Sequence, residues 1–302
     1  MALHILDSLM GAKQAGLMNR IVKMNILNDI SETALITLKA RVIEAKKEKP
    51  LIQDDMGVEL MDALRSLLPT ETRKRIIDRK LPLALTRYTA LRARKYDNYA
   101  REFIEKNPKG MVVSLGCGFD TRYWRVFDKS WPYVEIDLAP VIRIKKDILK
   151  DKISYSIFAC SVLDGKWIEE ISTFQNRKVL FLAEGLLMYL PQDSVERLFK
   201  DLSETFSESS IVFEAVNKKY TKGIRKKLVE TKMRRRLGNK AGAAYQFGVN
   251  DASEIEFYGK GIRVMEEWSF FEDQDLRPKY LRLFKKMKLF TRTQWTIKAN
   301  FA

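Results

Sequence analysis

The fold is decided by the stretch Met111-Val112-Val113-Ser114-Leu115-Gly116-Cys117-Gly118-Phe119-Asp120. Its apolar half predicts a buried strand, and the glycines that follow predict a sharp turn at the end of that strand. Twenty-one residues after Gly116, Asp137 closes a second apolar run, Tyr133-Val134-Glu135-Ile136. Glycine lets the backbone approach a ligand closely, and an acid at the end of the next strand accepts hydrogen bonds from ribose hydroxyls. The stretch therefore predicts a nucleoside pocket.

A pocket of this kind binds either a dinucleotide or S-adenosylmethionine, and the turn favours the second ligand. The dinucleotide fingerprint is G-x-G-x-x-G, and Thr121 stands where its third glycine would be. Because S-adenosylmethionine carries no phosphates, its turn needs no third glycine. We expect Gly116, Gly118 and Asp137 to bind this cofactor.

The pattern after residue 110 is typical of an α/β fold. Short apolar runs alternate with helical segments, which predicts a parallel sheet covered on both faces with its ligand at the carboxyl ends of the strands. The five expected strands are Val112–Leu115, Tyr133–Ile136, Ser154–Ala159, Val179–Ala183 and Ile211–Val216. The alternation over 290–301 places Trp295 and Ile297 on one face and predicts a final antiparallel pair.

Three regions follow from these patterns. Residues 1–106 are expected to form an N-terminal helical cap, with Ser31 as a helix cap and a long helix over 83–106. Residues 107–216 are expected to form the S-adenosylmethionine-binding core. Residues 217–302 are expected to form a basic, helical insertion (a lid) and the C-terminal strands that complete the sheet.

The composition indicates an ordinary globular protein, with 302 residues, 46% of them hydrophobic and 31% charged. No apolar run approaches the roughly 20 residues that a membrane helix needs, so no membrane partner is expected. The start of the chain lacks the basic-then-apolar order of a secretory signal. The only cysteines, Cys117 and Cys160, are in or beside apolar runs, which favours a cytoplasmic location.

The single histidine, His4, excludes several chemistries. A Ser-His-Asp or Cys-His hydrolase would depend on that one residue near the terminus, and a zinc site with several His or Cys ligands cannot be assembled. We therefore expect no metal and no imidazole base, and the sequence identifies no catalytic residue.

The formal net charge of +16 has two interpretations. It is either a basic solvated surface or the sign of an anionic partner, because a positive field speeds the encounter with acids and nucleic acids. The densest basic run extends from Lys218 to Arg236. A small anionic substrate is the preferred partner, and nucleic acid stays an alternative.

Arg92 belongs to a stripe of otherwise aromatic side chains on the helix over 83–106. The members recur at spacings of three and four and are Tyr88, Arg92, Tyr96, Tyr99 and Phe103. A guanidinium on a core-facing stripe either reaches solvent from its edge or meets an anion. Arg92 is thus a candidate clamp for the methionyl carboxylate of the cofactor, with Arg94 as the fallback if the helical phase differs.

Glu184 ends the fourth expected strand and begins the segment Glu184-Gly185-Leu186-Leu187-Met188-Tyr189-Leu190-Pro191. An acid at this edge of the sheet can accept from the amino group of the ligand, line the approach to the sulfonium, or cap the next helix. The apolar segment Leu186–Leu190 is expected to belong to the core, and within it Tyr189 could face the cation.

The chain resembles the leucine carboxyl methyltransferase family from about residue 28 to 300. Segments that stand in the family's order are Ser31-Glu32-Thr33-Ala34-Leu35, Leu91-Arg92-Ala93-Arg94-Lys95-Tyr96-Asp97, Leu115-Gly116-Cys117-Gly118-Phe119-Asp120-Thr121-Arg122, Glu135-Ile136-Asp137-Leu138 and Ala183-Glu184-Gly185-Leu186-Leu187-Met188-Tyr189-Leu190-Pro191. Glu266-Glu267-Trp268-Ser269 and Gln294-Trp295-Thr296 look like its bacterial branch, which resembles the tetracenomycin polyketide carboxyl O-methyltransferase.

The resemblance implies a class I methyltransferase fold, Rossmann-like, with an N-terminal helical cap and a helical insertion after the fifth strand. Carried over by position, Arg92 would hold the methionyl carboxylate and Gly116 would approach the ligand by its backbone. Asp137 would bind the ribose, and Glu184 would lie by the methionyl amino group.

The resemblance also implies roles for three further residues. Ser161 and Val162 belong to the segment that should pass the adenine, where the family usually has Asp at the position of Ser161. A hydroxyl there can still bond the adenine amino group, but more weakly. Lys39 matches a family lysine near the ligand in a loosely aligned region.

The sequence thus predicts an S-adenosylmethionine-dependent O-methyltransferase that acts on a carboxylate of a small, polyketide-like acid. A carboxylate is ionised at neutral pH, so its methylation needs no general base, which fits the near-absence of histidine. Two alternatives stay open: an RNA-modifying methyltransferase, and a non-catalytic protein that binds the cofactor.

Overall fold

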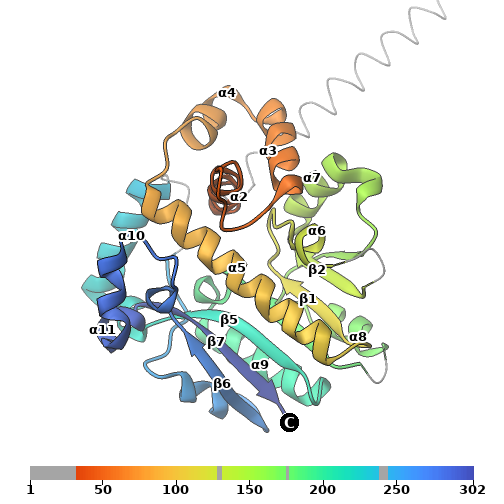
Figure 1. Cartoon of the computed structure of the whole chain (residues 1–302). Coiled ribbons are helices and arrows are strands. Elements are labelled where there is room, and N and C mark those ends of the chain that lie inside the picture. Colours follow the sequence, from red (N-terminus) through yellow and green to blue (C-terminus); the bar gives the residue numbers. More distant parts are fainter. Residues whose placement is uncertain (1–31, 128–130, 175–176, 238–243) are drawn as a thin grey trace, which may run out of the picture.

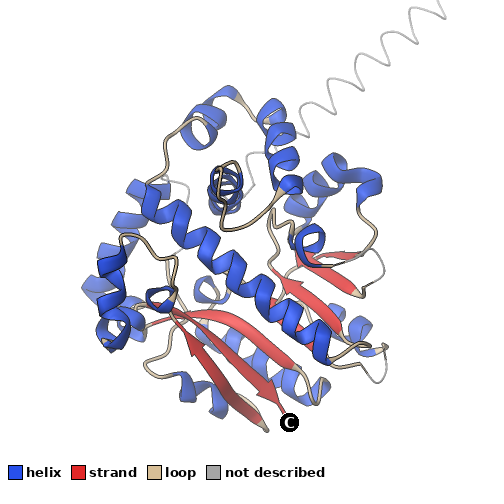
Figure 2. Ribbon diagram, viewed as in Figure 1, coloured by secondary structure: helices blue, strands red, loops and turns tan. Residues whose placement is uncertain are grey.

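The structure, a computed structural model, describes residues 32–127, 131–174, 177–237 and 244–302. One sheet of seven strands crosses the molecule between helices (Figures 1 and 2). The strands are β1 (Met111–Leu115), β2 (Tyr133–Asp137), β3 (Ser156–Ala159), β4 (Val179–Ala183), β5 (Ser210–Val216), β6 (Ile262–Trp268) and β7 (Gln294–Phe301). Their spatial order is β3-β2-β1-β4-β5-β7-β6, which is the order of a class I methyltransferase sheet.

Ten α-helices lie in the described residues. They are α2 (Glu32–Ala45), α3 (Asp55–Leu67), α4 (Thr70–Thr72), α5 (Leu83–Lys106), α6 (Arg122–Val126), α7 (Ala139–Leu149), α8 (Lys166–Ser172), α9 (Gln192–Thr205), α10 (Gly223–Leu237) and α11 (Lys288–Thr291). Shorter or tighter turns of helix are η1 (Arg73–Ile77), η2 (Lys150–Lys152), η3 (Leu187–Tyr189), η4 (Lys218–Tyr220), η5 (Ala252–Phe257), η6 (Phe270–Glu272) and η7 (Lys279–Lys286). None of the described helices is long and apolar enough to cross a bilayer.

The two faces of the sheet are covered by different helices. Tyr96 and Tyr99 of α5 pack on Val112, Leu180 and Val212 of the first face. On the other face, the apolar sides of α8 and α9 pack on the alternate residues of the same strands, including Val113, Phe181 and Phe213. Because consecutive residues of a strand point to opposite faces, the continuous apolar runs of β1, β4 and β5 are explained by burial on both sides.

The parallel core is confirmed, with small shifts at the ends of the strands. β1 pairs in parallel with β2 and β4, β2 with β3, and β4 with β5. The third expected strand began at Ser154, but the pairing of β3 begins at Ser156, and the Ser154 hydroxyl instead lies 2.7 Å from the hydroxyl of Tyr123. β3 is an edge strand paired only with β2, so its length is set by that single neighbour.

The C-terminal strand is antiparallel, as the alternation predicted. β7 pairs with β5 on one side and with β6 on the other. It begins at Gln294 rather than at Phe290, which lies in α11. Trp295 and Ile297 are both buried. The second edge strand, β6, was not predicted as a strand, because after the buried Ile262 its residues alternate only between exposed and half-buried positions.

The N-terminal helices form a separate apolar cluster over one end of the sheet (Figure 1). Leu35 and Leu38 of α2 and Leu60 and Leu64 of α3 pack with Val141 of α7, which follows β2. The cap is thereby fixed to the edge at which the glycine turn lies. The long helix predicted over 83–106 is α5 with those bounds, while Ser31 and His4 lie outside the described residues.

Candidate active site

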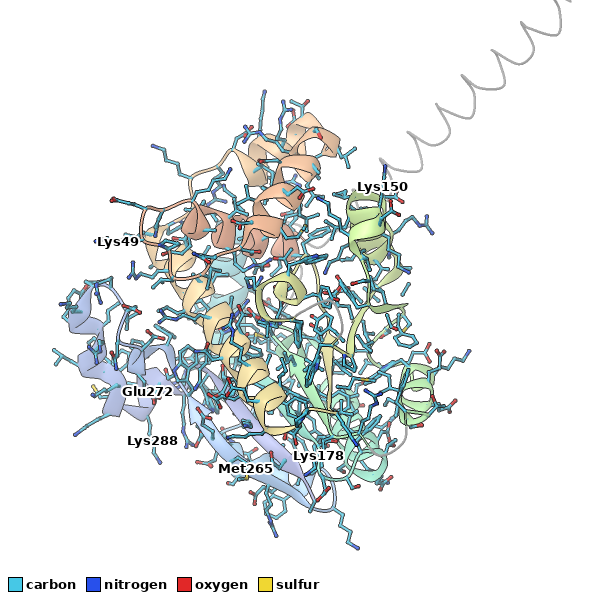
Figure 3. All side chains as sticks on the ribbon, turned by 45° about the vertical axis from the view of Figure 1, so that its right-hand side comes forward. Lys49, Lys150, Lys178, Met265, Glu272 and Lys288 are labelled. Carbon is cyan, nitrogen blue, oxygen red and sulfur yellow. The ribbon has the colours of Figure 1, made fainter. Side chains whose placement is uncertain are left out.

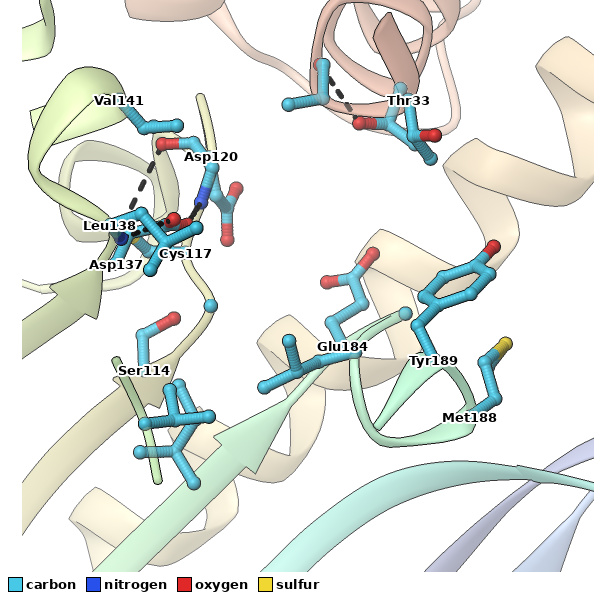
Figure 4. Close-up of a pocket in the computed structure, with 18 of the residues that line it drawn as sticks. Thr33, Ser114, Cys117, Asp120, Asp137, Leu138, Val141, Glu184, Met188 and Tyr189 are labelled. Carbon is cyan, nitrogen blue, oxygen red and sulfur yellow. Dashed lines mark hydrogen bonds between the residues drawn. The ribbon is translucent and has the colours of Figure 1, made fainter. Parts of the chain in front are cut away.

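A pocket of about 370 Å³ lies at the carboxyl ends of the parallel strands, beneath α2. Figure 4 shows Asp137 on one side of it and Glu184 on the other, with Thr33 of α2 above them. The structure brings together all seven residues predicted to bind the cofactor, and they line this one pocket: Arg92, Gly116, Gly118, Asp137, Ser161, Val162 and Glu184.

The turn after β1 requires glycine at two positions. Gly116 has φ +60° and Gly118 has φ +53°, which are left-handed values that other residues rarely adopt. A Cβ at position 116 would lie 2.7 Å from Cδ1 of Leu186. The bare backbone of the turn therefore forms part of the pocket wall.

Asp137 is held at the end of β2 by two amide groups. Gly118 N–H donates to Oδ2 at 2.6 Å, and Leu138 N–H donates to Oδ1 at 2.7 Å. Burial raises the pKa of Asp137 even though both amide bonds favour the charged form. Each carboxylate oxygen has a second lone pair, so the fixed side chain can still accept bonds from a pair of vicinal hydroxyls.

Arg92 is buried, with 8% of its surface exposed, and it contacts two carboxylates. Its Nε donates to Oε1 of Glu184 at 2.9 Å, and its Nη1 lies 3.0 Å from Oε2 of Glu214. The alternative that Arg92 reaches solvent from the edge of the stripe is therefore wrong. Within the described residues Nη2 has no hydrogen-bond or ion-pair partner, so it can donate to a ligand in the pocket.

Glu184 lies between two guanidinium groups. Besides Arg92, Arg122 approaches it, with Nη2 2.5 Å from Oε2. Burial alone would raise the pKa of Glu184, but Arg92 and Arg122 outweigh burial and hold it below its usual value. The expectation that Glu184 caps a helix is wrong, because η3 begins after Leu186 without a side-chain cap.

Sequence reasoning missed the buried arginines behind this pair. Arg122 is fully buried and also pairs with Asp97 at 2.8 Å and with Asp120 at 2.7 Å. Arg125 bonds the other oxygen of Asp97 at 2.8 Å and Asp120 at 3.0 Å. No local signal marked them, because arginines three residues apart soon after a turn are also typical of the solvated side of a surface helix.

Arg41 and Glu214 were missed as well. Arg41 of α2 lines the pocket and donates from Nη2 to the carbonyl of Phe119 at 2.8 Å. Glu214 accepts from the Tyr88 hydroxyl at 2.7 Å and from the Gln294 amide at 2.9 Å. The signal for Glu214 was an acid within the apolar run of β5, a position that is costly to bury without partners.

Further residues that line the pocket lie at its two ends, the Asp137 end and the Glu184 end. Ser161 and Val162 follow β3 beside the Asp137 end, and the Ser161 hydroxyl accepts from Leu163 N–H at 3.2 Å. Tyr189 lies at the Glu184 end and its ring packs 5.7 Å from that of Tyr245 (centroid to centroid). Burial raises the pKa of Tyr189 to about 12.

Two expected residues lie elsewhere. Lys39 does not line the pocket, because its ammonium donates to the carbonyl of Ile76 at 2.9 Å and to that of Arg79 within the cap. Arg94 points to the other side of α5, where it pairs with Asp273 at 2.9 Å and Asp275 at 2.7 Å. Among the described residues no cluster of His, Cys, Asp or Glu is arranged to hold a metal ion.

These residues fit S-adenosylmethionine. A free guanidinium donor and a carboxylate lie together at one end, which suits the carboxylate and ammonium of an amino acid, and a fixed acid at the other end suits a ribose. The model of the leucine carboxyl methyltransferase family matches residues 34–203. The chain belongs to this family.

Curated relatives agree with that family. The tetracenomycin polyketide synthesis O-methyltransferase TcmP of Streptomyces glaucescens is 26% identical over 262 residues, covering 83% of this chain and 88% of its own. The S-adenosyl-L-methionine-dependent methyltransferase dpfgK of Gibberella zeae is 25% identical over 268 residues, which cover 82% of this chain and 84% of dpfgK. This leucine carboxyl methyltransferase family member is thus an S-adenosylmethionine-dependent methyltransferase.

Among solved structures, the magnesium protoporphyrin IX methyltransferase of Synechocystis with bound S-adenosylmethionine is similar. It is 12% identical, with a TM-score of 0.43 over 83% of this chain and 98% of that one.

Proposed function

We propose that this methyltransferase transfers a methyl group from S-adenosylmethionine to a carboxylate of a small, polyketide-like acid. The observation that carries the proposal is the absence of a ready base among the described residues that line the pocket. None of them is a histidine or a lysine, and the three acids among them are engaged: Asp120 and Glu184 with arginines, and Asp137 with two backbone amides. Burial raises the pKa of Cys117, Cys160 and Tyr189, so these groups stay protonated near neutral pH.

A carboxylate acceptor suits such a site because it arrives already ionised. A hydroxyl acceptor would have to lose a proton, and the acids nearest the Tyr189 end are engaged: Glu184 with two arginines, Glu214 with Arg92 and Gln294. The name of TcmP, a polyketide O-methyltransferase, and the net charge of +16 support an acidic polyketide-like acceptor.

When bound, S-adenosylmethionine supplies a methyl group on a positively charged sulfur. In this proposal Arg92 and Glu184 hold the two ends of its amino acid, and Asp137 holds the ribose. Ser161 and Val162 contact the adenine. Fixing the ligand at these points leaves the methyl group directed to the acceptor, and positioning of this kind is worth up to roughly 7–11 kcal/mol.

Transfer of the methyl group to a carboxylate needs no reagent besides the donor and the acceptor. A carboxylate oxygen forms a bond to the methyl carbon, the carbon–sulfur bond breaks, and its electron pair stays on sulfur. The acceptor loses its negative charge and the donor its positive charge. Arg92 is buried and the side chain of Glu184 is only 14% exposed, so little water reaches this end of the pocket to solvate either charge.

The test is a substrate screen that follows release of S-adenosylhomocysteine. The panel pairs each aromatic polyketide-type acid with its primary alcohol and its amide, and products are checked for an alkali-labile ester. We expect turnover of acids only. Turnover of alcohols or phenols alone would contradict the carboxylate assignment, and turnover of RNA would place the chain with RNA-modifying enzymes. Stabilisation by S-adenosylhomocysteine without any turnover would leave a cofactor-binding protein.

A further inference from the structure

The part of the chain that connects β6 to β7 carries exposed apolar and basic side chains that take no part in the methyl-transfer site. The segment over 279–289 comprises η7 and the start of α11, and its exposed side chains are of only two kinds. The apolar ones are Tyr280, Leu283, Met287 and Leu289, with 62%, 78%, 46% and 63% of their surface exposed. The basic ones are Lys279, Lys285, Lys286 and Lys288. We call these eight side chains the basic apolar strip.

The strip is fixed to the protein by its inner side. Phe284 packs on Phe290 with ring centroids 4.4 Å apart, and both rings contact Phe271 at 6.3 and 6.4 Å. The aromatic cluster orders the segment, so the strip is presented outward as a preformed surface. Figure 3 shows the side chain of Lys288 at the outer edge of this lobe.

The positive charge of the strip is not neutralised by an ion pair within the described residues. The chain has no Asp or Glu after Asp275, while seven basic residues occur between Arg277 and Arg292. In the described part of the chain none of the four lysines of the strip forms an ion pair. Exposed apolar side chains are therefore interleaved with unpaired positive charge.

We propose that the basic apolar strip docks this enzyme on an anionic lipid surface. Interleaved leucines and lysines are the pattern of segments that lie in the plane of a membrane, with apolar groups in the acyl boundary and ammonium groups at the phosphates. Each lysine near such a surface strengthens the attraction to the anionic headgroups, and the apolar side chains add to binding when they are buried. The sequence predicted no membrane partner because nothing spans a bilayer, but docking on a surface needs no span.

Other occupants fit less well. A second copy of the chain would place the strip's four lysines against the same four lysines on a symmetric interface, and the strip itself contains no acid to compensate them. Nucleic acid stacks on aromatic rings, and Tyr280 is the only exposed ring among the eight side chains, the others being aliphatic or thioether.

Docking would orient the active site. None of the strip's residues lines the pocket, but Gln294, which does, follows the last of them, Leu289, by only five residues. An amphiphilic acid held in the lipid surface would then be close to the pocket.

Vesicle co-sedimentation tests the proposal with the full chain. The wild type should bind vesicles of phosphatidylcholine with one third phosphatidylserine and should not bind phosphatidylcholine alone. Replacing Lys279, Lys285, Lys286 and Lys288 by Gln should weaken binding roughly a hundred- to a thousandfold, since four lysines act together. Leu283→Ser with Leu289→Ser should also release the protein.

Matched controls distinguish an effect of the strip from an effect of net charge or of exposed apolar surface in general. Gln at the exposed Lys80, Lys109, Lys146 and Lys166 removes the same charge elsewhere, and Phe257→Ser removes an apolar side chain that is 88% exposed. Both controls should bind as the wild type does. Equal loss with the control lysines, absent vesicle binding, or a dimer in sedimentation velocity that Leu283→Ser abolishes would each overturn the proposal.

Discussion

Arg92 Nη1 lies 3.0 Å from Oε2 of Glu214, and both side chains are buried at the inner end of the pocket. Glu184 contacts the same guanidinium from its other side at 2.9 Å. One arginine therefore compensates parts of two buried carboxylates while it keeps a free donor toward the pocket. The pair Arg92–Glu184 is ordered before a ligand binds, which lowers the entropy that binding must overcome.

Arg92→Ala should weaken the binding of S-adenosylhomocysteine by about 2–3 kcal/mol, which is roughly 30- to 150-fold, because the clamp for its carboxylate is lost. The variant should also unfold more easily, since Glu184 and Glu214 are left buried beside an unfilled space. Calorimetry at a temperature at which circular dichroism shows a folded protein measures the affinity.

Two further variants separate the clamp from general destabilisation. Arg92→Lys keeps the charge but loses the planar fork, so its affinity should lie between those of the wild type and Arg92→Ala. Arg94→Ala, on the same helix and outside the pocket, should bind as the wild type does. Full affinity in Arg92→Ala would remove Arg92 from the binding site.

Gly116→Ala should destabilise the protein by about 1–3 kcal/mol, because alanine is strained at φ +60°. Its Cβ would also meet Leu186, whose side chain must shift. Gly165→Ala is the control, since a Cβ there has no neighbour within 4 Å and φ is −61°. Urea unfolding should show no loss for the control, and equal losses for both variants would argue against a conformational need for glycine in the turn.

The sequence predicted the parallel core well because burial on both faces leaves uninterrupted apolar runs, as in Val179–Ala183. It predicted β6 poorly, since an edge strand with one half-buried face shows little apolar alternation. Arg92 was found because a charge among rings is conspicuous. Its partner Glu214 was not, because a single acid in an apolar run does not reveal which helix packs on that strand.

The arginines after the turn show a second limit. Arg122 and Arg125 stand three residues apart in a stretch rich in aromatic residues, and arginines at this spacing would give the same pattern on the solvated side of a surface helix. Their burial follows only from the way that α2, α3 and α5 close over the turn, which brings Asp54 and Asp97 to them. Such contacts between distant segments leave no local signal.

Ser161→Asp should tighten the binding of S-adenosylhomocysteine about tenfold, because a carboxylate accepts a stronger hydrogen bond from the adenine amino group than a hydroxyl does. The family resemblance of the sequence implies Asp at this position. Ser161→Asn adds similar volume without charge and should gain less. Calorimetry that finds unchanged or weaker binding in Ser161→Asp would place the adenine elsewhere.

The pH dependence of stability should reveal Glu184. Arg92 and Arg122 hold its pKa below the usual value in the folded protein, so the unfolded chain binds the proton more readily. The stability that ionised Glu184 contributes to the folded protein is fully present above its unfolded pKa of about 4.3. This contribution is lost as the pH falls through the lower pKa of the folded protein. Glu184→Gln lacks this contribution at every pH. The gap in unfolding free energy between the wild type and Glu184→Gln, measured in urea, should therefore be largest near neutral pH and shrink below about pH 4. A gap that stays constant into acid would show that the two arginines do not stabilise the ionised carboxylate.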